Sequence, residues 1–142
     1  MTGPHPIVLY DGVCALCNRL VKFILKHDRL DRFRFAALQS DFARTLLHAY
    51  AIDPQALETV CLVLDHGQPT QRVETRSTAV LTILRELGPT WGALANLLSA
   101  IPRGLRDWAY KRIASCRYRI FGKYETCPLP SPGDRHKFLD LA

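Results

Sequence analysis

A short apolar run leads directly into two closely spaced cysteines, and this junction constrains the fold more than any other feature. Ile7-Val8-Leu9-Tyr10 is rich in strand-forming residues and ends at the turn pair Asp11-Gly12. Cys14 follows at once, and from there to His27 apolar residues recur on one face at helical spacing. The sequence predicts a buried strand, a loop and an amphipathic helix, with Cys14 and Cys17 in the first helical turn.

Strand and helix signals alternate through the next sixty residues. The predicted elements are a strand over Arg32–Phe35, a helix over Asp41–Tyr50 capped by Ser40, strands over Thr59–Leu64 and Thr70–Glu74, and a helix over Thr78–Leu87 capped by Ser77 and stopped by Gly88-Pro89. The order β-α-β-α-β-β-α is the thioredoxin arrangement, in which helices cover a central sheet. We therefore expect an α/β, thioredoxin-like fold whose site opens at the first strand–helix junction.

The last third of the chain predicts helices without further strands. Trp91–Phe121 is expected to form two helices broken at Ile101-Pro102, with Gly122 ending the second. The proline-rich stretch from Cys127 to Gly133 predicts irregular structure. One domain spanning the 142 residues is expected: a core of about residues 6–88, a C-terminal helical extension of about 90–122 and an irregular tail over 123–142.

Composition indicates a globular protein in a reducing compartment. The chain is 48% hydrophobic and 23% charged, which is typical of a packed domain. Its five cysteines and the lack of a secretory signal at Met1–Pro6 argue against a disulfide framework and favour the cytoplasm. Trp91–Ile101, the longest nearly apolar segment, is too short to cross a bilayer of roughly 30 Å, so no transmembrane helix is expected.

The net charge of +6 is concentrated near the C-terminus, where seven basic residues between Arg103 and Lys123 face only Asp107. Aromatic residues lie between these charges, a mixture found on helices that bind nucleic acid or membrane surfaces. We favour a structural interpretation and keep an anionic partner for this basic helix as the alternative. The apolar residues expected to pack on the sheet are Leu105, Trp108, Ala109, Ile113 and Cys116.

Cys14 and Cys17 have the spacing that dithiol chemistry uses. A disulfide exchange catalyst needs one thiolate to attack and a second thiol close enough to resolve the mixed disulfide. Unpaired N–H groups and the positive end of the helix dipole stabilise a thiolate at a helix start. We therefore expect Cys14 to be the nucleophile and Cys17, one turn further in, to be the resolving thiol.

The carboxylate of Asp11, three residues before Cys14, has two roles open to it. As a structural group it would be the N-cap of the helix, accepting the N–H of Val13 or Cys14. As a functional group it would accept the proton of Cys17 during resolution or tune the thiolate of Cys14. We favour the cap, which does not exclude the chemical role.

A lone CxxC motif is compatible with redox chemistry, with half of a zinc site and with idle buried thiols. The strand-to-helix setting favours redox chemistry. The remaining cysteines and the five histidines show no second CxxC and no HxxxH spacing. We expect no metal and no bound cofactor, and keep a metal site completed by Cys127 or a partner chain as an alternative.

The segment Tyr10-Asp11-Gly12-Val13-Cys14-Ala15-Leu16-Cys17-Asn18 resembles the signature of the DCC family, which is named for its Asp and two Cys. Four later segments agree with the family pattern: Arg76–Leu81, Ile101–Asp107, Arg117–Gly122 and Cys127–Pro130. The resemblance covers nearly the whole chain. It implies a thioredoxin-like, bacterial-type domain with thiol-disulfide oxidoreductase activity, a protein or small-molecule thiol or disulfide as substrate, and Asp11, Cys14 and Cys17 as signature residues.

One departure from the thioredoxin pattern bears on mechanism. Thioredoxins place a cis-proline just before the third strand, where it holds an extended substrate. Here Glu58-Thr59-Val60 stands at that place, and Pro54 comes too early. A different kind of substrate or metal binding therefore stays open, as does a non-catalytic binding module on the same scaffold. We expect Cys61 to be a core residue. We expect Cys127 to be a packed thiol, and a third thiol partner near the CxxC motif is the alternative for it.

Overall fold

The computed structural model describes residues 5–29, 31–50, 60–65, 69–122 and 132–139. Four strands form one mixed sheet in the order β2-β1-β3-β4, namely β1 (Ile7–Tyr10), β2 (Arg34–Ala37), β3 (Val60–Leu64) and β4 (Arg72–Thr75). β1 runs parallel to β2 and antiparallel to β3, and β3 is antiparallel to β4. The α/β class with a thioredoxin-like sheet is confirmed.

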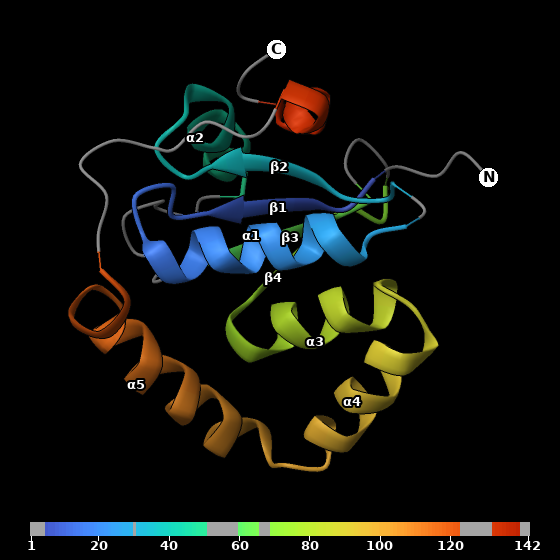
Figure 1. The fold of residues 1–142 in the computed structure, drawn as a ribbon, viewed down its shortest axis with the longest axis vertical. Helices are drawn as coiled ribbons and strands as arrows, with labels where there is room; N and C mark the ends of the chain where they lie inside the picture. The colour runs from blue at the N-terminus through green and yellow to red at the C-terminus, as the bar shows by residue number, and fades with distance from the viewer. Residues whose placement is uncertain (1–4, 30, 51–59, 66–68, 123–131, 140–142) are drawn as a thin grey trace.

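Helices cover both faces of this sheet (Figure 1). Helices α1 (Ala15–His27) and α3 (Arg76–Glu86) pack on one face, and α2 (Asp41–His48) packs on the other. Side chains alternate along β1, so that Val8 and Tyr10 meet α1 and α3 while Ile7 and Leu9 meet α2. Because both faces are buried, β1 has the continuous apolar sequence from which it was predicted.

Two further helices form the C-terminal extension. Helices α4 (Pro89–Ser99) and α5 (Arg103–Phe121) curve from the end of α3 back toward the start of α1 (Figure 1). The predicted break at Ile101-Pro102 and stop at Gly122 are confirmed, and Gly122 has a φ of 96°, a conformation that favours glycine. Within the described ranges, no helix is long and apolar enough to cross a membrane.

The predicted buried face of α5 is wrong. Leu105, Trp108 and Ile113 are 56%, 59% and 52% exposed. The inward side instead carries Ala114, which is 1% exposed, and Tyr110, whose hydroxyl accepts a hydrogen bond from the N–H of Val60. The reason is that α1 and α3 already cover this face of the sheet, so α5 packs on those two helices.

The two predicted helix caps have different outcomes. Ser40 caps α2, accepting the N–H of Ala43 at 3.2 Å, as predicted. Ser77 does not cap α3, which begins at Arg76, two residues earlier than predicted, with Thr75 in the N-cap position. The Ser77 hydroxyl instead donates to the carboxylate of Asp107 on α5, so a tertiary contact replaces the local cap.

Strand β2 begins at Arg34, two residues later than predicted. The carboxylate of Asp28, which is buried, accepts the N–H groups of Arg32 at 3.0 Å and Phe33 at 2.9 Å. These two N–H groups are therefore satisfied by a side chain and not by the ladder. Asp28 thus fixes the path of the chain between α1 and the sheet.

Asp28→Ala is expected to lower the free energy of unfolding by about 2 to 3 kcal/mol, because it leaves two backbone donors without their acceptor. Urea unfolding followed by circular dichroism measures this loss. Asp31→Asn is the matched control, since Asp31 is half-exposed and asparagine tolerates its φ of 54°. The control is expected to cost under about 1 kcal/mol; equal losses in both variants would contradict the account.

The stretch expected to be irregular contains a short 3-10 helix, η2 (Pro132–Lys137). Phe138 follows it, is 3% exposed, and stacks on Phe35 with ring centroids 5.1 Å apart. Burial of this ring orders the segment, and Pro132 is compatible with the first position of a helical turn.

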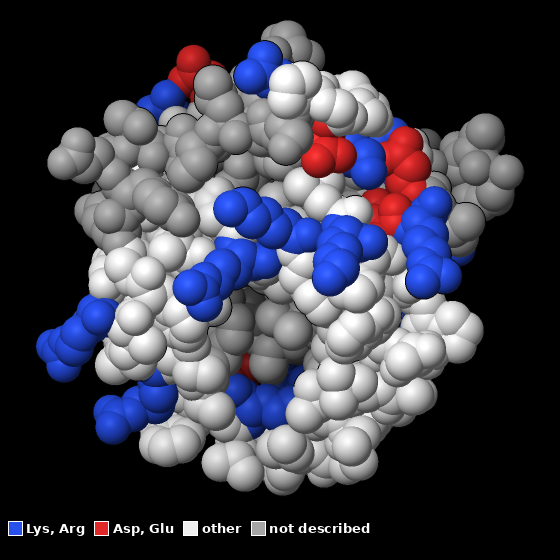
Figure 2. Space-filling view, viewed as in Figure 1, with Lys and Arg blue, Asp and Glu red and all other residues white. Residues whose placement is uncertain are grey.

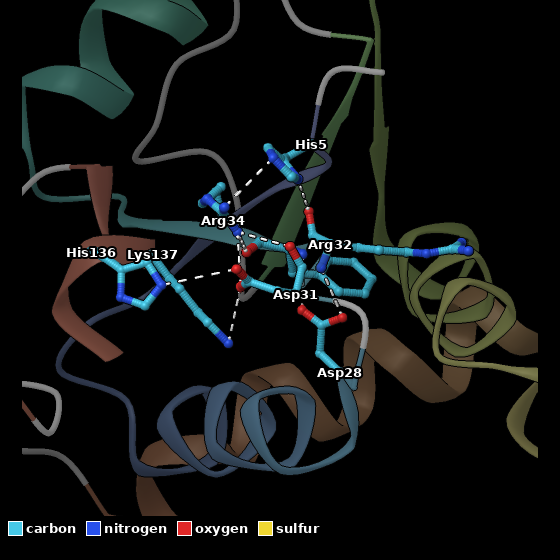
Figure 3. A network of polar contacts seen from close by, with 8 residues as sticks. His5, Asp28, Asp31, Arg32, Arg34, His136 and Lys137 are labelled. Carbon is cyan, nitrogen blue, oxygen red and sulfur yellow. Dashed lines mark hydrogen bonds and ion pairs between the residues drawn. The ribbon is translucent and has the colours of Figure 1, made fainter. Parts of the chain in front are cut away.

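Charged residues attach η2 to the loop before β2 (Figure 3). Lys137 and Arg34 contact the carboxylate of Asp31 at 3.2 Å each, and His136 lies 3.9 Å from it. Burial opposes ionisation of Asp31, but the hydrogen bond from Lys137 and the neighbouring positive charges hold its pKa below the ordinary value. The carboxylate is therefore charged at neutral pH and holds the tail against the core.

Candidate active site

The two motif cysteines lie together at the start of α1. Cys14 is the N-cap residue, and its Sγ accepts the N–H of Cys17 at 3.5 Å. Both side chains are buried, with exposures of 0% for Cys14 and 1% for Cys17. An N-cap sulfur next to the unpaired N–H groups of a helix is in the position that stabilises a thiolate.

Asp11 is not the N-cap, which corrects our favoured structural role for it. Its carboxylate does accept the N–H of Val13 at 3.2 Å, and its carbonyl accepts the N–H of Cys14 at 3.1 Å. Asp11 therefore closes the turn that leads to the cap, and Cys14 itself provides the cap. Asp11 as a whole residue is 5% exposed.

Two residues that the sequence did not single out hold the carboxylate of Asp11. Gln39 donates its amide N–H to Oδ1 at 2.8 Å and accepts the N–H of Gly12 at 3.1 Å. The hydroxyl of Tyr118 donates to Oδ2. Gln39 is 28 residues and Tyr118 is 107 residues from Asp11 in sequence, so no local pattern predicts these contacts. Tyr118 does lie in a segment that agrees with the family pattern.

Asn18 fixes the loop from inside the helix. Its amide donates to the carbonyl of Gly12 at 2.8 Å and to the carbonyl of Cys14 at 2.9 Å. Buried amide groups of this kind hold a loop in one conformation because each lost hydrogen bond leaves a buried polar group unsatisfied. Asn18 is the last residue of the signature segment.

Burial raises the pKa of the Cys17 thiol well above its ordinary value, and the neighbouring Cys14 sulfur and the Asp11 charge raise it further. Cys17 therefore carries its proton at neutral pH. Cys61, which lies in the core as expected, has its pKa raised to about 12 by burial. It packs with α2 on the opposite face of the sheet.

The C-terminal end of α5 covers the start of α1. The carbonyl of Gly122 accepts the N–H of Ala15 at 3.2 Å, and the guanidinium of Arg19 lies 5.8 Å from the ring centre of Phe121. Tyr118 joins the same contact through Asp11. Cys14 itself packs in the core cluster with residues of β1 and α1, so a local opening is needed before a substrate reaches its sulfur.

Gly122→Ala is expected to raise the alkylation rate of Cys14 several-fold at constant pH. The φ of 96° at Gly122 costs an L-residue roughly 1 to 2 kcal/mol, which weakens the contact between the end of α5 and the start of α1 beside Cys14. Quenched-flow alkylation with mass spectrometry measures the rate. Gly104→Ala in the first turn of α5, where no atom lies within 4 Å of the added methyl, is the control and is expected to leave the rate unchanged.

A cavity of about 170 Å³ borders Cys17 between α1, α3 and α5. Its lining is almost wholly apolar and consists of Leu16, Cys17, Leu20, Val60, Val80, Tyr110, Ile113 and Ala114. A cavity of this size accommodates a small apolar group. The Cys17 side chain therefore borders an apolar cavity.

The structure gives no support for a metal site among the residues that it describes, and it leaves several of the other residues named from the sequence undescribed. In the described ranges, no group of three or more His, Cys, Asp or Glu residues is placed to hold a metal ion. Cys127, Pro54 and the residues just before Val60 lie outside the described residues. Cys116 is half-exposed on α5.

Comparison with known proteins identifies the family. The model of the DCC1-like thiol-disulfide oxidoreductase family matches residues 8–123. The Bacillus subtilis protein YuxK is 38% identical over 136 residues, which cover 96% of this chain and 95% of that protein. A chloroplastic DCC family protein of Arabidopsis thaliana is 39% identical over 125 residues, or 88% of this chain and 70% of that protein. No solved structure matches the chain. The chain belongs to the DCC1-like thiol-disulfide oxidoreductase family.

Proposed function

We propose that the chain catalyses thiol–disulfide exchange with Cys14 as the nucleophile and Cys17 as the resolving thiol. The observation that carries the proposal is the N-cap position of Cys14, whose sulfur accepts the N–H of Cys17. Helix N–H groups stabilise negative charge on this sulfur, whereas burial keeps Cys17 protonated. The two thiols therefore have different roles.

The proposed reaction proceeds in two steps. The Cys14 thiolate attacks one sulfur of a substrate disulfide, forms a mixed disulfide and releases the other substrate sulfur as a thiolate, which takes a proton from solvent. Cys17 then loses its proton and attacks the Cys14 sulfur, which forms the Cys14–Cys17 disulfide and releases the second substrate thiolate. The substrate is reduced by two electrons. Two thiol groups of an external reductant, which are oxidised to a disulfide, then reduce the Cys14–Cys17 disulfide back to the dithiol.

Asp11 is proposed to accept the proton of Cys17 in the second step. Three donors hold its carboxylate next to the motif: the Val13 N–H, the Gln39 amide and the Tyr118 hydroxyl. Gln39 and Tyr118 thus act as positioning residues. We also propose a reducing compartment such as the cytoplasm, because the odd number of five cysteines does not suggest a disulfide framework.

The burial of both sulfurs favours a second function, a non-catalytic binding module on the same scaffold. The rate of iodoacetamide alkylation at neutral pH, read at each cysteine by mass spectrometry, separates the two functions. Redox catalysis predicts that Cys14 is alkylated much faster than Cys61, which is equally buried and serves as the internal control. A Cys14 that reacts no faster than Cys61 favours the binding module.

A further inference from the structure

The outward side of α5 carries large apolar side chains in water. Ile120 is 66% exposed, and Leu105, Trp108 and Ile113 are each more than half exposed. At about 100° per residue, these four side chains lie within a sector of roughly 140° around the helix. We call them the α5 apolar stripe. A contiguous patch of exposed apolar side chains often marks a site of interaction with a protein or a membrane.

Basic side chains interrupt this stripe. Arg112 and Arg119 lie within the same sector and are exposed, and the Arg112 guanidinium is 5.7 Å from the ring centre of Trp108. In Figure 2, Lys and Arg side chains project outward at the lower left, where Figure 1 places α5, among uncharged residues. The surface combines apolar and cationic groups without separating them into two faces.

The acidic residue of α5 faces the opposite way. The side chain of Asp107 is 19% exposed and accepts the hydroxyl hydrogen of Ser77 on α3. The guanidinium of Arg103 lies 3.7 Å from its carboxylate. The outward surface therefore has no carboxylate of its own to neutralise Arg112 and Arg119.

These observations distinguish between two possible partners for the outward side of α5, a second copy of the chain and an anionic membrane. In a symmetric dimer formed through this surface, the basic residues of the two copies would be brought into one interface, and like charges repel across an interface. An anionic bilayer surface satisfies both kinds of side chain at once. Apolar groups enter the boundary between headgroups and acyl chains, while arginine side chains extend to the lipid phosphates.

We infer that the outward side of α5 docks the protein on membranes that contain anionic phospholipid. The docking is peripheral: Leu105, Trp108 and Ile120 enter the headgroup boundary, and Arg112 and Arg119 contact phosphate. The inference does not rest on the proposed exchange chemistry, because Cys14 takes no part in the surface. Cys14→Ser is therefore expected to bind membranes as well as the unchanged chain does.

Sedimentation with vesicles tests the inference. The unchanged chain is expected to sediment with vesicles of phosphatidylglycerol and phosphatidylcholine but not with phosphatidylcholine alone, and to be released by high salt. Arg112→Glu is expected to weaken binding at least about fivefold. Arg44→Glu, on α2 beyond the opposite face of the sheet, makes the same charge change and is expected to have no effect.

The apolar component is tested by Trp108→Ser, which is expected to weaken binding at least about tenfold. Because Trp108 is more than half exposed, the variant should keep the circular dichroism spectrum of the unchanged chain. The inference is overturned by an absence of sedimentation with anionic vesicles, or by equal effects of Arg112→Glu and Arg44→Glu. Dimerisation of the chain that Trp108→Ser abolishes would overturn it in favour of a second copy.

Discussion

Cys14→Ser is expected to lower the rate of thiol–disulfide exchange at least about a thousandfold, because it removes the attacking sulfur. Serine is a preferred N-cap residue, so its hydroxyl replaces the sulfur as acceptor of the Cys17 N–H and the fold is kept. The loss therefore reports chemistry and not unfolding. Reduction of glutathione disulfide or of an aromatic disulfide provides the measurement.

Cys17→Ala is expected to give a different defect. The first attack proceeds, but the mixed disulfide at Cys14 persists because no second sulfur resolves it. Intact-protein mass spectrometry then shows the added mass of one substrate thiol. Cys61→Ala is the matched control, since Cys61 is equally buried but packs on the opposite face of the sheet. Full exchange activity in Cys14→Ser would exclude the proposed nucleophile.

Asp11→Asn is expected to slow release of the second substrate thiol about a hundredfold while leaving the first attack nearly unchanged. An amide has a shape close to that of the carboxylate but does not accept a proton. Single-turnover kinetics separate the two steps, since the first thiol is released in a fast phase and the second in a slow one.

The same substitution also tests the hydrogen bonds around Asp11. One end of the new amide is an N–H group, which replaces an acceptor of either the Gln39 amide or the Tyr118 hydroxyl. We expect a loss of about 1 to 3 kcal/mol in the free energy of unfolding. Tyr118→Phe removes one of these donors but keeps the carboxylate, so the rate at which Cys17 resolves the mixed disulfide should stay within a few-fold of that of the unchanged chain.

If Asp11→Asn resolves the mixed disulfide at the unchanged rate, Asp11 is not the base in this step.

The sequence predicted the elements whose signals are local. β1, the helix after Cys14 and the cap at Ser40 depend on neighbouring residues, and all three are present. The predicted cap at Ser77 and the predicted start of β2 were wrong because the hydrogen-bond partners involved are distant in sequence. Asp107 accepts the hydroxyl of Ser77, and Asp28 accepts two N–H groups that would otherwise bond within the sheet.

The α5 apolar stripe shows a different limit of sequence reasoning. Helical spacing identified the apolar residues of the helix, but spacing does not say whether a surface is available to bury them. The sheet face was already occupied by α1 and α3, so Leu105 and Trp108 stay in water and Ala114 faces inward. A membrane surface is the partner that we infer for the residues left exposed.

Formation of the Cys14–Cys17 disulfide in glutathione buffers tests the central claim most directly. The protein is equilibrated at a series of ratios of reduced to oxidised glutathione, quenched with acid, alkylated and analysed by peptide mass spectrometry. The account predicts a reversible two-electron transition confined to Cys14 and Cys17, with Cys61 reduced throughout. A pair that stays reduced across the whole series, or that forms only mixed disulfides with glutathione, would contradict it.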